Sequence, residues 1–407
     1  MNKPITPGLE ALSRQTSLMT QEKLLELPSG HKRLHIGLPK ERAMQENRVA
    51  LTPEAVQLLV NNGHEVWVEN GAGTAARFKD QDYSEAGAQI KYDAKEVLES
   101  EIVLKIEPPT PEEIEMIKPG KTLISALQIG NQQEDYFNLL NKKRITSIAF
   151  ELIEDKVGGM PVVRAMSEIA GSNVMLIAAE YLSTAGGGKG IIMGGITGVP
   201  PTEVVILGAG TVGEYAARAA LGMGANVKIF DVHIYKLRRI KHALCHHLFT
   251  STLDPLALTE SLKSADVVVG ALRAEKGRNR TVVTEAMVSK MKPGSIIIDV
   301  SIDQGGCVET SELTTLRKPV FHKHDVIHYC VPNIPARVAR TASQAFSNIF
   351  TPILLQTGEM SIDDMIFSHK WLMNGVYTYR GFLSNAHVAR KFNLKHKDLN
   401  LLMAARN

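Results

Sequence analysis

The chain of 407 residues is longer than one hydrophobic core usually supports, so its length predicts two domains. Hydrophobic residues make up 44% and charged residues 22%, as in ordinary soluble globular proteins. The 46 basic and 43 acidic side chains leave a net charge of +3, which argues against nucleic acid or an anionic membrane as the main partner.

Residues 1–33 are polar and irregular, and we interpret them as an N-terminal extension, either a frayed tail or an arm that packs on a neighbouring subunit. From residue 34 onward, short apolar runs alternate with segments of helical period. Strands are expected at 34–38, 64–69, 102–107, 122–127 and 147–153. A helix is expected to begin with Thr52 as its cap and Pro53 in its first turn. This alternation is typical of a mostly parallel sheet covered by helices.

A second alternating series occupies the later part of the chain. Residues 165–184 are expected to form one long helix, and the glycine-rich segment 185–201 a loop or a short hairpin. Further strands are expected at 203–207, 226–230, 266–270, 295–300 and 326–331, each rich in Val and Ile as in strands buried on both faces. After Pro335 the pattern is helical, and we expect this tail to return to the first domain. The fold class predicted is α/β, with two Rossmann-like domains built on parallel sheets.

Cysteine usage and hydropathy indicate a reducing compartment. The three cysteines form no CxxC pair and cannot all be joined in disulfides. No apolar run is typical of a signal peptide or reaches the roughly 18 apolar residues of a membrane span, so we expect a soluble cytoplasmic protein. His242, His246 and His247 lie in a basic helical stretch without carboxylates at ligand spacing, and we interpret them as solvated and expect no metal site.

The strand at 203–207 runs directly into a GxGxxG sequence that opens a helix. Gly208 permits the tight turn, Gly210 lets a pyrophosphate approach the backbone, and Gly213 lets the helix pack closely on the strand. The phosphates would face unpaired N–H groups at the positive end of the helix. Asp231 ends the next strand, where a carboxylate binds both ribose hydroxyls and repels the 2′-phosphate of NADP. The spacing predicts an NAD site; the alternative is a glycine-rich turn without a ligand.

Three polar residues near strand ends are candidates for chemistry, because ligands of open parallel sheets bind outside the carboxyl ends of the strands. Asp303 precedes two glycines and is interpreted either as an acid near the nicotinamide or as a turn aspartate. Asn333 lies beside prolines and is alternatively a turn asparagine. Arg48 is suited to clamp a small carboxylate with two parallel hydrogen bonds, but the same pattern fits a surface charge.

Six further segments carry recognisable motifs. They read Gly-Leu-Pro-Lys-Glu at 37–41, Asn-Arg-Val-Ala-Leu-Thr-Pro at 47–53, Gly-His-Glu-Val at 63–66, Gly-Ala-Gly at 71–73, Met-Ser-Glu-Ile-Ala-Gly at 166–171 and Ile-Asp-Gln-Gly-Gly-Cys at 302–307. Together with the glycine loop they resemble the alanine dehydrogenase family, which shares its fold with the NAD-binding subunit of proton-translocating transhydrogenase. The last two motifs are more similar to alanine dehydrogenase.

The resemblance implies a reaction and an architecture. The reaction is the reversible oxidative deamination of L-alanine to pyruvate and ammonium, with NAD taking the hydride. The implied architecture is a discontinuous catalytic domain, residues 34–165 and 338–407, into which an NAD-binding domain, residues 166–337, is inserted. The implied partners are a small amino-acid or 2-oxo-acid substrate and further copies of the chain in a homohexamer, with no nucleic acid and no membrane.

The resemblance also assigns residues by position. Arg48 is similar to the arginine that holds the substrate carboxylate, and Asp303 to the acid beside the nicotinamide and the reacting amine. The residues that match cofactor contacts are Ser167, Thr211, Val212, Asp231, Lys236, Leu272, Arg273 and Asn333, and the expected cofactor site also includes Gly208, Gly210, Gly213, Val300, Ile302, Asp303 and Val331.

Two positions of the substrate site depart from the family pattern. Glu107 stands where the family has its substrate-binding lysine, and Gln128 stands where it has its acid/base histidine. Losing a general acid/base commonly costs about 10²–10⁴-fold in rate. A carboxylate in place of a lysine also reverses the charge that faces an anionic substrate. The resemblance therefore supports NAD binding more strongly than it supports alanine oxidation.

Several alternatives stay open at these positions. Lys105 lies two residues before Glu107, on the same face of the strand, and is a candidate to reach the substrate. Glu107 is a candidate base or a ligand for an amino group. Alternatively, Asp303 alone transfers the protons. The sequence therefore predicts an NAD-dependent L-alanine dehydrogenase. The alternatives are a related amino- or imino-acid dehydrogenase with another substrate, and a non-catalytic NAD-binding protein.

Overall fold

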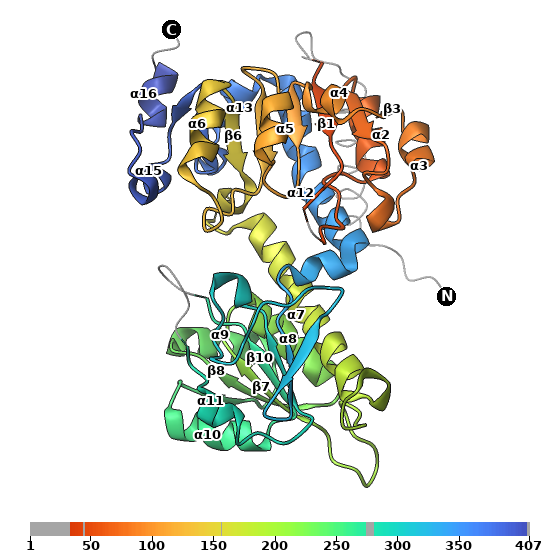
Figure 1. Ribbon diagram of the computed structural model, residues 1–407, viewed down its shortest axis with the longest axis vertical. Coiled ribbons are helices and arrows are strands. Elements are labelled where there is room, and N and C mark those ends of the chain that lie inside the picture. Colours follow the sequence, from red (N-terminus) through yellow and green to blue (C-terminus); the bar gives the residue numbers. More distant parts are fainter. Residues whose placement is uncertain (1–32, 44, 156, 274–280, 405–407) are drawn as a thin grey trace, which may run out of the picture. The chain divides into compact units, whose positions relative to one another are not determined.

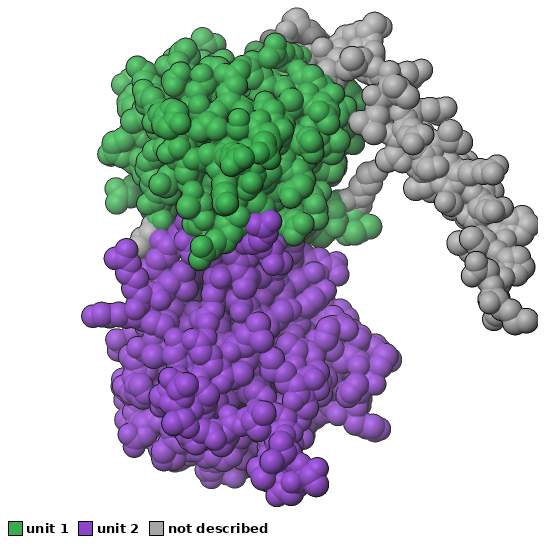
Figure 2. Space-filling model, turned by 90° about the vertical axis from the view of Figure 1, so that its right-hand side faces the viewer, with its two compact units in different colours: residues 1–43, 48–162, 343–407 green, residues 44–47, 163–342 purple. Residues whose placement is uncertain are grey.

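The computed structural model describes residues 33–43, 45–155, 157–273 and 281–404, and the predicted extension 1–33 lies almost wholly outside them. The chain forms two units (Figure 2). Unit 1 contains residues 1–43, 48–162 and 343–407, and unit 2 contains residues 44–47 and 163–342. The sequence places the domain boundaries at 165/166 and 337/338, and the structure divides at 162/163 and 342/343.

Unit 1 is built on an eight-stranded sheet of order β15-β14-β6-β5-β4-β1-β2-β3. The strands are β1 (His35–Leu38), β2 (Glu65–Glu69), β3 (Gln89–Lys91), β4 (Ile102–Leu104), β5 (Thr122–Ser125), β6 (Thr146–Ala149), β14 (Val376–Tyr379) and β15 (Phe382–Leu383). Strands β1 to β6 pair in parallel, whereas β14 pairs antiparallel with β6 and β15. The prediction that the chain is helical after Pro335 is therefore wrong at β14 and β15. These strands are too short for a period-2 pattern to stand out.

Helices α2 to α6 alternate with the strands of unit 1, whereas α12 to α16 belong to the C-terminal segment (Figure 1). They are α2 (Pro53–Asn61), α3 (Asp80–Glu85), α4 (Ala94–Leu98), α5 (Pro111–Met116), α6 (Glu134–Lys142), α12 (Ala339–Glu359), α13 (Ile362–Ser368), α14 (Lys370–Met373), α15 (Ala386–Phe392) and α16 (Leu399–Ala404), with 3-10 turns η1 (Thr74–Ala76) and η2 (Phe150–Leu152). The predicted start of α2 is confirmed, because Thr52 caps the helix and Pro53 is its first residue. Leu98, Ile114 and Phe137, from α4, α5 and α6, pack against the strand residues Val103 and Leu123 in one apolar cluster.

The C-terminal segment completes unit 1 through helix α12. The Oγ atom of Ser343 accepts a hydrogen bond from the Val49 backbone at 2.9 Å. One helical turn later, the Oγ atom of Ser347 accepts one from the Thr52 backbone at 2.8 Å. Both serines are buried. Two backbone N–H groups beside Arg48 are thus paired by a segment almost 300 residues further along the chain.

Unit 2 is built on a seven-stranded sheet of order β12-β13-β11-β10-β7-β8-β9. The strands are β7 (Glu203–Leu207), β8 (Asn226–Phe230), β9 (Phe249–Ser251), β10 (Val267–Gly270), β11 (Ile296–Asp299), β12 (Val320–Lys323) and β13 (Val326–Tyr329), and all except β12 run in parallel. Its helices and 3-10 turns are α7 (Pro161–Leu182), η3 (Thr184–Gly186), α8 (Thr211–Gly222), α9 (Ile234–Leu244), α10 (Pro255–Ser264), α11 (Glu285–Val288), η4 (Ile302–Gln304) and η5 (Ile334–Val338). The predicted α/β class with mostly parallel sheets is confirmed in both units.

Strand β7 is buried on both faces, as its unbroken apolar sequence predicts. Val204 and Ile206 belong to the apolar cluster that contains α8 residues, whereas Val205 and Leu207 belong to the cluster that contains α10 residues. Side chains that alternate along a strand therefore pack into separate helical layers on the two faces of the sheet.

Helix α7 is the described helix whose length and composition would also suit a membrane span. Its most apolar window has a mean hydropathy of 1.3, and 44% of that window is buried. A core helix of a soluble protein meets the same description, so this helix is weak evidence for a membrane.

Both sheets share one topological feature that positions ligands. In unit 1, β1 lies between β2 and β4, and in unit 2, β7 lies between β8 and β10. The strand order reverses at these points, and ligands of open parallel sheets bind in the crevice that the diverging connections leave outside the carboxyl ends. The loops after β1 and β4 in unit 1, and after β7 and β10 in unit 2, are therefore the places to look for sites.

We predict that Ser343→Ala lowers the free energy of unfolding by about 1–3 kcal/mol, because it leaves the buried Val49 N–H without its acceptor. Urea unfolding followed by circular dichroism measures the change. Ser368→Ala, at an exposed position of α13, serves as the control and should leave the unfolding midpoint unchanged. Equal midpoints for the two variants would contradict the role assigned to Ser343.

Candidate active site

The predicted dinucleotide loop has the backbone that its glycines were expected to allow. Gly208 has a φ of +116°, in the left-handed half of conformational space. A Cβ atom on Gly213 would lie 1.8 Å from the Gly208 carbonyl oxygen, so only glycine fits where α8 meets the loop. Helix α8 begins at Thr211 with Gly210 as its cap, and its first N–H groups have no partner within the helix.

The glycine loop and the neighbouring Asp231 have the space and the acceptors that a dinucleotide needs. A Cβ atom on Gly210 would meet no atom within 4 Å, so the loop borders open space on the side where a pyrophosphate would approach. Asp231, directly after β8, is buried, and its carboxylate accepts hydrogen bonds from Ala209 N at 2.7 Å and His233 N at 2.8 Å. A carboxylate has about four acceptor positions, so two ribose hydroxyls fit as further donors.

Arg239 is a residue of this region that the sequence analysis missed. From helix α9, its Nη2 atom donates to the Ala209 carbonyl at 2.9 Å. It therefore places a positive charge beside the glycine loop, 4.0 Å from the Glu214 carboxylate. The basic run on α9 was the available signal, but it did not distinguish Arg239 from its neighbours.

The other expected cofactor residues lie mostly at the carboxyl edge of the unit 2 sheet. Leu272 and Arg273 follow β10, Val300, Ile302 and Asp303 follow β11, and Val331 and Asn333 follow β13, whereas Thr211 and Val212 begin α8, Lys236 lies in α9 and Ser167 in α7. Asn333 has a left-handed backbone with φ +59° and donates from Nδ2 to Glu46 at 2.7 Å, which fits the turn interpretation.

Asp303 lies in the turn η4, and a buried carboxylate holds that turn. The side chain of Asp299 accepts hydrogen bonds from the Ser301 hydroxyl at 2.7 Å, the Ser311 hydroxyl at 2.8 Å and the Cys307 N–H at 3.0 Å. The sequence analysis did not single out Asp299, although it is the last residue of a buried strand. The Asp303 side chain itself is exposed, yet desolvation by the surrounding protein raises the pKa of its carboxyl, and the charge of Asp299 acts in the same direction.

In unit 1, the structure brings together Arg48, Glu107 and Gln128. The Arg48 guanidinium is buried, lies over the Phe346 ring at 5.5 Å and has its Nη2 atom 3.7 Å from Glu107 Oε1. The amide Nε2 of Gln128 donates a hydrogen bond to Glu107 Oε2. The surface interpretation of Arg48 is therefore wrong. The arginine faces Glu107, and Gln128 bonds the same carboxylate. These are the two positions at which we expect a departure from the family pattern.

Lys105 occupies a different environment from the one that would allow it to reach a substrate. Its side chain is 2% exposed, and its Nζ atom lies 3.0 Å from Glu113 Oε1 and 3.4 Å from Glu41 Oε2. Glu41 also accepts hydrogen bonds from the backbone N–H groups of Ile106 and Glu107. These contacts favour a structural role for Lys105. Ion pairs link the side chains of Glu41, Arg42, Glu69, Lys105 and Glu113, and the hydrogen bond from the Glu107 backbone to Glu41 places this group next to the Arg48–Glu107 pair. We call these seven residues the unit 1 ion cluster.

Glu151 supports the loop that carries Gln128. Gln128 has a left-handed backbone with φ +46°, and the Oε1 atom of Glu151 accepts hydrogen bonds from Leu127 N at 2.8 Å and Gln128 N at 3.0 Å. Its Oε2 atom is buried without a hydrogen-bond partner among the described residues. Burial raises the pKa of the Glu151 carboxyl. Glu151 lies in the turn η2, two residues after the end of strand β6, and this position near a strand end was the signal that could have found it.

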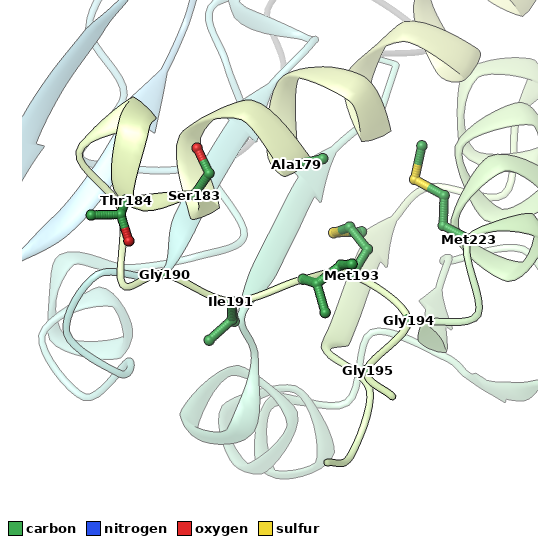
Figure 3. A pocket seen from close by; sticks show the side chains of 10 residues that line it. Ala179, Ser183, Thr184, Gly190, Ile191, Met193, Gly194, Gly195 and Met223 are labelled. Carbon is green, nitrogen blue, oxygen red and sulfur yellow. The ribbon is translucent and has the colours of Figure 1, made fainter. Parts of the chain in front are cut away.

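Two other features lie apart from these residues. Among the described residues, no group of three His, Cys, Asp or Glu side chains could hold a metal ion. Figure 3 shows a cavity of about 530 Å³ in unit 2, lined mainly by apolar and glycine residues. Its lining comes from the end of α7, the segment 190–195 and Met223, and includes none of the predicted site residues.

The reversal of strand order at β7, the glycine loop and the carboxylate of Asp231 define the class as an NAD-dependent dehydrogenase with a Rossmann-type cofactor unit. The chain belongs to the alanine dehydrogenase/PNT family, because the family's N-terminal domain model matches residues 37–170 and its C-terminal domain model matches residues 174–386. The predicted resemblance, the enzyme class of NAD-dependent amino-acid dehydrogenase and the cofactor NAD are thereby confirmed.

Individual relatives agree with the family. An alanine dehydrogenase of Bacillus subtilis is 38% identical over 89% of this chain and 95% of its own length. One of Methanococcus maripaludis is 39% identical over 89% of this chain and 97% of its own length. A solved L-alanine dehydrogenase matches with a TM-score of 0.83 at 34% identity, over 88% of this chain and 99% of its own. A transhydrogenase of Sinorhizobium meliloti, at 24% identity and a TM-score of 0.74, shares the fold.

We predict that Gly213→Ala weakens NADH binding by at least about tenfold, equivalent to about 1.4 kcal/mol, because the new methyl group displaces the start of α8 from the loop. Fluorescence titration with NADH measures the dissociation constant. Gly222→Ala, in the same helix, is the matched control, since a Cβ atom there would meet nothing within 4 Å. Equal losses in both variants would mean that the helix tolerates no alanine at all and would refute the specific role of Gly213.

The raised pKa of Glu151 predicts a pH dependence of the free energy of unfolding. Because the pKa of Glu151 is raised in the folded state, its contribution to stability is complete below its ordinary value of 4.5 and is lost as pH rises through the folded value. The stability of the wild type relative to Glu151→Gln should therefore fall as the pH rises above the ordinary value of 4.5. Urea unfolding of both proteins across this range tests the sign. A relative stability that rises with pH would contradict it.

Proposed function

We propose that the chain catalyses the reversible oxidative deamination of L-alanine to pyruvate and ammonium. The observation that carries the proposal is the buried guanidinium of Arg48, which lies near the reversal point of the unit 1 sheet and is suited to bind a small carboxylate. The relatives described as alanine dehydrogenases support the choice of alanine. A homohexamer in the cytoplasm, as the resemblance to the family and the sequence composition lead us to expect, is part of the proposal.

Each proposed role follows from the chemistry of one side chain. Arg48 binds and orients the substrate carboxylate through parallel N–H donors. The residues of the glycine loop and Asp231 hold the cofactor, and bound NAD supplies the acceptor for the hydride that leaves the substrate Cα. Asp303 orients the amine or the attacking water at its carboxyl oxygens and exchanges a proton with it. Gln128 has no group that titrates near neutral pH, so we assign the proton transfer to Asp303 rather than to Gln128.

A second candidate is a related amino- or imino-acid dehydrogenase with another substrate. It is favoured by Glu107, whose carboxylate stands beside Arg48 where an anionic substrate would bind. A third candidate, a non-catalytic NAD-binding protein, is motivated by the replacement of the family's lysine and histidine with Glu107 and Gln128. These candidates predict different outcomes in one assay.

The deciding experiment is NADH oxidation at neutral to alkaline pH with ammonium and a panel of 2-oxo acids that includes pyruvate. Turnover that is fastest with pyruvate supports alanine as the substrate. Turnover with a different oxo acid supports the second candidate. Absence of turnover across the panel, in protein that binds NADH by fluorescence titration, rejects the proposed enzyme and leaves the third candidate.

We predict that Asp303→Asn lowers kcat by about 10²–10⁴-fold and leaves the dissociation constant for NADH nearly unchanged, because the amide cannot transfer a proton. Steady-state kinetics and NADH titration measure the two quantities separately. Glu309→Gln, an exposed change of the same charge on unit 2, is the control. Unchanged turnover in Asp303→Asn would remove Asp303 from the mechanism.

A further inference from the structure

Arg48 and Glu107 place a positive and a negative group side by side. We propose that this pair is a subsite for the whole zwitterionic head of an amino acid, in which Arg48 binds the carboxylate and Glu107 binds the cationic nitrogen. The inference deepens the proposed dehydrogenase function and rests on it. It assigns Glu107 a ligand in both reaction directions, the α-ammonium group of the amino acid and the free ammonium ion.

The separation of the two groups fits such a head group. The 3.7 Å between Arg48 Nη2 and Glu107 Oε1 is longer than an N–H···O hydrogen bond, which spans about 2.7–3.2 Å. In an amino acid, the carboxylate oxygen and the α-nitrogen lie about 3 Å apart, because three covalent bonds join them. A distal ammonium on a longer side chain would lie too far from the carboxylate to use neighbouring groups, so the pair selects the α-nitrogen.

Neighbouring polar groups fix the position of the Glu107 carboxylate. Gln128 donates its amide N–H to Oε2, and the Arg48 guanidinium faces Oε1. Glu151 fixes the left-handed backbone of Gln128 and thereby aims this amide. Three residues thus orient one carboxylate, which is 14% exposed and therefore neither solvated on the surface nor sealed in the core.

The charge balance of the unit 1 ion cluster points to the same class of ligand. The cluster contains three cations, Arg42, Arg48 and Lys105, and four carboxylates, which gives a net charge of −1 when all are ionised. Lys105 and Arg42 are already paired with carboxylates. A 2-oxo acid, which carries only a negative charge, gains little from this cluster, whereas a zwitterion or an ammonium ion meets complementary charge.

This assignment predicts that Glu107→Gln affects the nitrogen-bearing ligands and pyruvate differently. The Michaelis constants for L-alanine and for ammonium should rise by about 10- to 100-fold, because a charge-assisted hydrogen bond to the nitrogen is lost. The Michaelis constant for pyruvate should stay unchanged or fall, because a negative charge beside Arg48 is removed. Glu107→Asp, which keeps the charge, should recover part of the ammonium affinity. A general disturbance of the fold would raise all three constants together.

The experiment measures all three constants for the wild type, both Glu107 variants and Glu112→Gln, an exposed carboxylate of α5 outside the cluster, as the charge control. Thermal unfolding of each protein shows whether it is folded. A rise of the constants for L-alanine and ammonium without a rise for pyruvate in Glu107→Gln, with Glu112→Gln like the wild type, supports the subsite. A parallel rise of all three constants in folded Glu107→Gln, or no change in any of them, overturns it.

A binding measurement separates failure of this inference from failure of the proposed function. Calorimetric titration of the protein compares L-alanine with propionate, which has the same carboxylate and no nitrogen. Tighter binding of alanine that is lost in Glu107→Gln supports the subsite even in a protein without turnover. Equal binding of the two ligands, or binding of neither, overturns it even if the enzyme is active.

Discussion

The reversal of strand order beside the first strand of each sheet is the constraint on which the rest of the structure depends. Because β1 has β2 on one side and β4 on the other, the connections that leave β1 and β4 diverge and open a crevice at the carboxyl edge. The same holds for β7 between β8 and β10. Arg48 and Glu107 follow β1 and β4, and Gly208 and Leu272 follow β7 and β10, so the topology selects which side chains can meet a ligand.

Buried carboxylates fix these loops by accepting hydrogen bonds from the backbone. Glu41 holds residues 106 and 107, Glu151 holds residues 127 and 128, Asp231 holds residue 209, and Asp299 holds the turn after β11. Such charge-assisted bonds are each worth about 1.5–3 kcal/mol. They act on the main chain, so they support whichever side chain stands at a site position.

The features that could be predicted from the sequence are those that depend on residues close together in the chain. The glycine loop and Asp231 follow from steric rules within some 20 residues, and the buried parallel strands follow from composition. Glu41 and Glu151 were missed because their role is a contact with backbone from another segment. Asp299 was missed because no motif marked it, although it bonds residues that follow it within 12 positions of the chain. Arg48 was assigned by resemblance, and the same pattern also suggested a surface charge. The burial of Arg48 depends partly on helix α12, whose Phe346 ring lies against the guanidinium. Strands β14 and β15 were missed because pairing with β6 stabilises segments that are too short to show a period.

The discontinuity of unit 1 has a consequence for biosynthesis. Residues 163–342 of unit 2 form one nearly continuous stretch, whereas unit 1 needs β14 from beyond residue 342 to cover β6 and α12 to pair the N–H groups of Val49 and Thr52. Domains generally fold as their chain emerges from the ribosome. Unit 2 can therefore form its glycine loop for the dinucleotide while the segment around Arg48 in unit 1 still lacks its hydrogen bonds to α12. The nascent chain gains a place for the cofactor before it gains a finished place for the substrate.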